Sequence, residues 1–90
     1  MSESRLELSG DLTVREVPEI WGRHRKRFAA GDLPEDIDLA DVARTDSSAL
    51  ALLLEWRSRA LERGGDVRFL DPPRSLRVFA RITEVEELLG

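Results

Sequence analysis

Residues 38–54 read DLADVARTDSSALALLL, and this stretch decides how the chain folds. Its first residues belong to a segment, residues 36–40, in which polar and apolar side chains alternate as they do in a half-buried strand. Residues 46–48 are Asp-Ser-Ser, three consecutive residues of the type that caps a helix, and an apolar run follows them directly. The stretch therefore predicts a strand, a short loop and a long helix that ends at about Arg63, where Gly64 and its neighbouring glycine follow.

The chain before this stretch predicts further strand structure and one more helix. Residues 5–9 alternate between polar and apolar side chains, and residues 10–11 are Gly-Asp, which predicts a turn that closes this strand. Residues 12–14 predict a brief second strand. Residues 16–30 carry apolar side chains at helical spacing, and the Gly-Asp-Leu-Pro run of residues 31–34 is expected to end this helix.

The chain after the long helix continues the same alternation. Residues 67–70 predict a strand, residues 73–81 a third helix, and residues 83–89 a last short helix that opens on a capping box. Strands that alternate with helices are typical of parallel sheets joined by right-handed crossovers. We therefore expect residues 1–90 to form a single α/β domain, with a small mixed, largely parallel sheet of three or four strands and four helices.

Composition limits the classes of function. The chain has 90 residues, a net charge of −4 and no cysteine, and His24 is its only histidine. The acidic balance disfavours nucleic-acid binding, and no apolar run approaches the roughly 18–20 residues that span a bilayer. The first residues do not resemble a signal peptide. No catalytic constellation, metal-ligand set or glycine-rich phosphate loop is visible, so we expect a protein that is not an enzyme, binds no cofactor or metal, and does not insert into membranes.

Two charged clusters each allow a structural and a functional interpretation. The basic run of residues 23–27 is either a solvated helix face, with His24 at the margin of the core, or a patch for an acidic partner or a lipid headgroup. Asp36 and Asp38 share one face of a predicted strand, where they either bind Mg²⁺ weakly or carry surface charge. The structural interpretation is favoured for both clusters.

Residues 38–54 resemble the central signature of the STAS domain family, in which a strand ending in Asp-Leu-Ser leads through a short loop to Asp-Ser-Ser-Gly-Leu and an apolar helix. Residues 8–12 resemble the early strand-glycine-strand element of this family, and residues 64–65 resemble its second helix-to-strand turn. Ala49 departs from the pattern, because the family usually has glycine there. The resemblance spans residues 5–89 and implies the STAS fold.

The beginning of the chain resembles one branch of this family more than another. Only four residues precede Arg5, and this compact start is similar to the MlaB-type STAS subunit of the Mla phospholipid-transport ABC complex. That resemblance implies a non-catalytic, cytoplasmic subunit that binds and regulates the transporter's ATPase, which holds it at the inner face of the membrane. The alternative is an anti-sigma-factor antagonist. Phosphorylation of Ser47 would then control its binding to a serine kinase that is the anti-sigma factor.

The candidate partner-binding residues are Asp46, Ser47, Ser48, Leu52 and Trp56. Capping of the helix by one of the first three is expected, and the resemblance implies that Ser47 is the phosphate acceptor if the domain is a switch. At about 100° per residue, the apolar arc of this helix is about 200° wide. Such an arc either is buried deeply or exposes one edge, formed by Leu52 and Trp56, to a partner.

Overall fold

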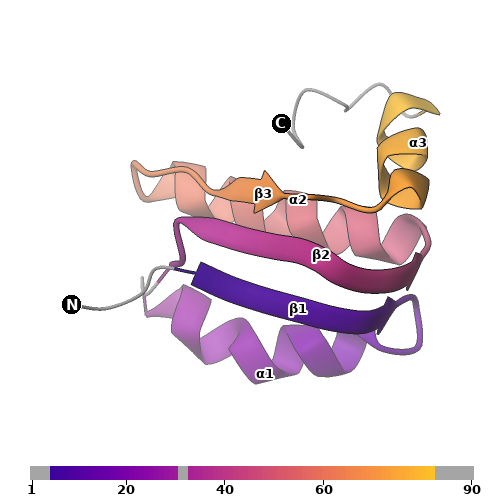
Figure 1. Ribbon diagram of the computed structural model, residues 1–90. Coiled ribbons are helices and arrows are strands. Elements are labelled where there is room, and N and C mark those ends of the chain that lie inside the picture. The colour runs from indigo at the N-terminus through magenta and orange to yellow at the C-terminus, as the bar shows by residue number, and fades with distance from the viewer. Residues whose placement is uncertain (1–4, 31–32, 83–90) are drawn as a thin grey trace.

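The computed structural model describes residues 5–30 and 33–82, which form three strands and three helices (Figure 1). In chain order they are β1 (Arg5–Leu12), α1 (Val17–Ala29), β2 (Asp36–Thr45), α2 (Ser47–Glu62), β3 (Arg68–Leu70) and α3 (Arg74–Ile82). The α/β class and the alternation of strands and helices are confirmed. The fourth helix, expected at residues 83–89, and the first half of the turn at residues 31–34 lie outside the described residues.

The sheet has the strand order β1-β2-β3, and both strand pairs are parallel. Crossovers between parallel strands are right-handed in nearly all proteins. Because each strand is added on the same side of the strand before it, the helices of successive crossovers lie on the same face of the sheet. Figure 1 shows α1 and α2 lying along one side of the strands. The described chain therefore has two layers, and one face of its sheet has no helix on it.

The two long strands run further than the sequence predicts. Gly10, placed in a turn by the sequence, lies inside β1 with a positive φ of 78° and pairs with Val42. The register shifts on either side of this pair, so β1 bends at bulges instead of ending. Leu12 and Val42 are both buried, and burying them favours the longer strands over a turn at residue 10.

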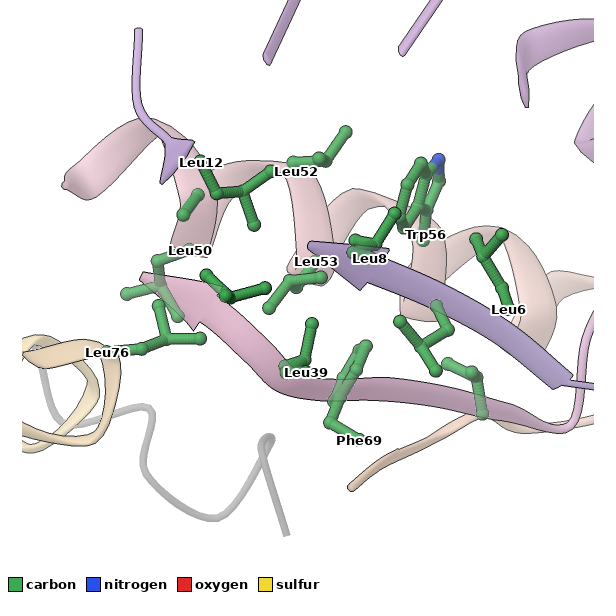
Figure 2. Close-up of a cluster of buried hydrophobic side chains, with 14 of the residues drawn as sticks. Leu6, Leu8, Leu12, Leu39, Leu50, Leu52, Leu53, Trp56, Phe69 and Leu76 are labelled. Carbon is green, nitrogen blue, oxygen red and sulfur yellow. The ribbon is translucent and has the colours of Figure 1, made fainter. Parts of the chain in front are cut away.

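The hydrophobic core lies between the sheet and α2 (Figure 2). Leu39 and Leu53 have no exposed surface, and Leu8 and Phe69 pack beside them from the flanking strands. Leu76 attaches α3 to the same cluster. Because α2 also contacts α1 and α3, most of its wide apolar arc is covered, and Leu61 near the end of the helix is 52% exposed.

The opposite face of the sheet carries charged side chains in complementary pairs. Asp36 accepts a hydrogen bond from Arg68 at 2.9 Å, and Asp38 is paired with Arg5 on the neighbouring strand. Both carboxylates therefore lie beside arginines of neighbouring strands, as charged groups on the outer face of the sheet. Within residues 5–30 and 33–82 no group of three potential ligands could hold a metal ion.

Candidate protein-binding site

The site is built where the central strand ends and α2 begins. Asp46 caps the helix, because its carboxylate accepts the backbone N–H of Ser48 at 2.8 Å. Its second oxygen accepts the backbone N–H of Val14 at 3.0 Å, which ties the start of α2 to the turn that follows β1. The N–H groups of Val14 and Ser48 hold the pKa of the Asp46 carboxyl below its usual value. Ser47 is therefore not the cap, and its side chain is exposed at the first position of the helix.

The turn between β1 and α1 holds an exposed apolar side chain in a fixed place. Glu16 accepts the backbone N–H of Thr13 at 2.9 Å and also its hydroxyl, and these donors lower the pKa of the Glu16 carboxyl. The backbone carbonyl of Thr13 in turn accepts the N–H groups of Glu16 and Val17. Between these bonds Val14 is 65% exposed. An apolar side chain on a braced turn can contact a partner with little loss of conformational entropy.

A groove of about 440 Å³ continues from this end of the sheet between α1 and α2. Its lining is mainly apolar and consists of Val17, Pro18, Trp21, Ser48, Ala51, Leu52 and Glu55. Arg59 lies 5.0 Å from the centre of the Trp21 ring and is paired with Glu55 at 3.0 Å. The groove thus offers apolar walls with a charged pair beside them, which suits an apolar side chain of a protein partner. We call Val14, Ser47, Ser48 and this groove the docking surface.

The structure corrects the expected exposure of Leu52 and Trp56. Leu52 is 4% exposed and forms part of the groove lining, and Trp56 has no exposed surface. The Trp56 ring stacks on Phe28 with 4.9 Å between ring centroids, so α1 covers the edge of α2 that the sequence left open. Trp56 belongs to the core, so of the two arrangements that the sequence left open, the exposed edge formed by Leu52 and Trp56 is wrong.

The docking surface contains residues that the sequence analysis missed. Val14 was assigned to a brief second strand, and Trp21 was counted only as part of the apolar face of a helix. Their placement depends on the turn at residues 13–16 and on the angle between two helices, which local patterns do not report. The available signal for this surface was Val14 itself, because it is an apolar residue in the short turn that precedes α1.

One further interpretation from the sequence, the place of His24, is confirmed beside this site. On α2, Arg57 forms two hydrogen bonds to the Asp66 carboxylate at 2.9 and 3.1 Å. His24 lies half-buried at the margin of the core, and its ring meets Trp56 edge-on at 6.0 Å between centroids. Burial lowers the pKa of the imidazole, and Arg27 and Arg23 lower it further.

The depressed pKa of His24 predicts a specific loss of stability in mild acid. In the unfolded chain the imidazole titrates near its ordinary value of about 6.5, so the unfolded state binds the proton more readily and stability falls as the pH drops through that value. Urea unfolding at pH 7.5 and pH 5.5 checks this. The decrease is expected to be larger for the natural chain than for His24→Gln, and equal decreases in the two proteins would contradict it.

None of the helices within residues 5–30 and 33–82 combines the length and the apolar character needed to cross a membrane.

These features define a small parallel α/β domain in which a capped helix begins, at an exposed serine, directly after the central strand. The family model described as "Mlab, STAS domain" matches residues 1–90, and the chain belongs to this family of STAS domains. Among solved structures, the chain is similar to one entitled "Structure of the Anti-Sigma Factor Antagonist SpoIIAA in its Unphosphorylated Form". The two share 19% sequence identity with a TM-score of 0.71, over 91% of this chain and 77% of the other. No curated protein sequence matches the chain.

Proposed function

We propose that this domain is a non-catalytic regulatory subunit that binds the ATPase of an ABC-type phospholipid transporter through the docking surface. The observation that carries the proposal is the docking surface itself, where an exposed Ser47, an exposed Val14 and an apolar groove lie together at the start of α2. The family description points to the Mla type of STAS domain, and STAS domains are generally non-catalytic regulators.

The proposed mechanism is a shift of population in the partner. An apolar side chain of the ATPase enters the groove, and the surface around Ser47 contacts its neighbours. If the domain binds one arrangement of the ATPase more tightly than another, binding favours that arrangement and so changes the rate of hydrolysis. The domain then acts in the cytoplasm, at the inner face of the membrane, where its partner holds it.

A second candidate is an anti-sigma-factor antagonist that binds a serine kinase. The similarity to the SpoIIAA structure supports it, together with the exposed position of Ser47. A phosphate on Ser47 would lie at the positive end of the α2 dipole, close to the carboxylate of Asp46. The added negative charge would then weaken binding to a partner that the unmodified serine fits.

Affinity purification of the tagged protein from its native cell extract, with identification of partners by mass spectrometry, separates the two candidates. Recovery of an ABC ATPase together with its permease supports the transporter subunit. Recovery of a serine kinase supports the antagonist and contradicts the transporter subunit. Recovery of neither class of protein contradicts both.

Ser47→Asp is expected to abolish partner recovery while leaving the fold intact. A carboxylate in the first turn of a helix is favourable by about 0.3–1 kcal/mol, so the variant should unfold at the same or a higher urea concentration. Ser47→Ala is the matched control, because it removes the hydroxyl without adding charge and leaves the Asp46 cap in place. Binding by Ser47→Asp at the level of the natural chain would place the partner elsewhere on the domain.

A further inference from the structure

Helix α3 presents an unusual outer face. Leu76 and Ala80, four residues apart, are buried against the rest of the domain. Val78 and Ile82, also four residues apart, lie on another side of the helix and are 41% and 71% exposed. Because residues at this spacing share one helix face, α3 carries a second apolar row directed toward solvent.

A row of arginines borders the exposed apolar row. Arg74, Arg77 and Arg81 follow one another at intervals of three and four residues, and all three are exposed. The nine residues of α3 contain no aspartate or glutamate, although the whole chain has a net charge of −4. Within the described residues, α3 therefore contributes three arginines and no carboxylate of its own to this face.

A groove of about 430 Å³ runs along the exposed apolar row, and it is lined by Arg74, Ser75, Val78, Phe79 and Ile82. The hydroxyl of Ser75 shares a hydrogen bond with that of Thr45 at the end of β2, which fixes the first turn of α3 against the sheet. The groove is thus a defined apolar depression with a guanidinium group in its lining.

We propose that this face of α3 binds an acidic segment of a partner protein, with one apolar side chain of the segment in the groove and a carboxylate on Arg74, the arginine that lines the groove. Arginine pairs with carboxylates through charge-assisted hydrogen bonds, which give the contact its specificity. Amphipathic segments are commonly bound in this way, with apolar anchors in a groove and charges at its border. An anionic membrane fits less well, because the depression is concave and the acidic chain is repelled by such a surface.

This second surface is separate from the docking surface and does not depend on the identity of the partner there. The docking groove lies between α1 and α2, and among residues 5–30 and 33–82 none lines both grooves. A protein with two such surfaces can hold two segments at once, from one partner or from two.

A displayed library of random twelve-residue peptides, selected on the full chain, tests the proposal. We expect enrichment of peptides in which an apolar residue is flanked by aspartate or glutamate. A synthetic peptide of the selected sequence is then titrated against three variants. Arg74→Glu should weaken binding about tenfold, because a charge-assisted hydrogen bond is lost. Arg25→Glu, the same charge change at an exposed position of α1, and Ala51→Arg, in the docking groove, should leave binding unchanged.

Four outcomes would overturn the proposal. One is a selection without acidic peptides, and another is equal weakening by Arg74→Glu and Arg25→Glu, which would indicate an unspecific charge effect. A third is loss of binding in Ala51→Arg, which would place the peptide in the docking groove. The fourth concerns binding of the chain to phosphatidylserine vesicles. If Arg74→Glu abolishes this binding and the selected peptide does not compete with it, the outer face of α3 recognises lipid and not a peptide.

Discussion

Trp56→Ala is expected to lower the free energy of unfolding of the domain more than any other substitution proposed for it. Trp56 has no exposed surface and stacks on Phe28 of α1, so truncation leaves a large cavity between the two helices. Replacing a buried tryptophan by alanine costs about 3–5 kcal/mol. A domain of this length is stabilised by only about 5–13 kcal/mol, so this one substitution removes a large share of its stability. Urea unfolding followed by far-UV circular dichroism measures the loss.

Two companion variants separate the possible causes of this loss. Trp21→Ala removes a tryptophan that is only half-buried in the docking groove, and it should destabilise the domain much less. Trp56→Phe retains an aromatic ring for Phe28 and removes an indole N–H that has no hydrogen-bond partner among the described residues. It should therefore recover most of the stability. If Trp56→Ala unfolds like the natural chain but fails to bind its partner, the result would contradict the assignment of Trp56 to the core. It would mean that the Trp56 side chain contacts the partner.

The central part of the fold was predictable because its signals are local. Alternation identifies β2, three cap-forming residues mark the start of α2, and a pair of glycines marks its end. The cap itself was predicted only as one of three residues. The structure selects Asp46, because its carboxylate reaches both Ser48 in the helix and Val14 in the turn after β1.

Only part of the docking surface was predictable: the sequence indicated Ser47, Ser48 and Leu52, but the groove depends on how the helices pack. An apolar arc of about 200° is compatible with full burial or with one exposed edge, and periodicity does not distinguish these cases. The side chain that decides the question is Phe28, which covers Trp56 from a helix almost thirty residues earlier in the chain. Gly10 was similarly ambiguous, since a glycine with positive φ fits a bulge in a long strand as well as a turn.

Ala51→Arg is expected to weaken binding of the partner recovered by affinity purification about 100-fold, because a charged side chain would fill a groove that an apolar group must enter. Ala51 lines the groove and is exposed, so the substitution creates no clash inside the domain. Arginine also has a high helix propensity, and α2 should remain intact. Isothermal titration with the purified partner measures the change in affinity.

Ser58→Arg is the matched control for this variant. Ser58 is exposed on the same helix, two turns beyond Ala51, and it is not part of the groove lining. Both substitutions add one positive charge to α2, so a general electrostatic effect would appear in both. Weakening confined to Ala51→Arg assigns the partner to the groove between α1 and α2, whereas equal weakening by both variants would mean that the partner contacts α2 without entering this groove. The control therefore separates filling of the groove from the addition of charge to α2. Only a partner whose side chain enters the groove is consistent with the proposed docking surface.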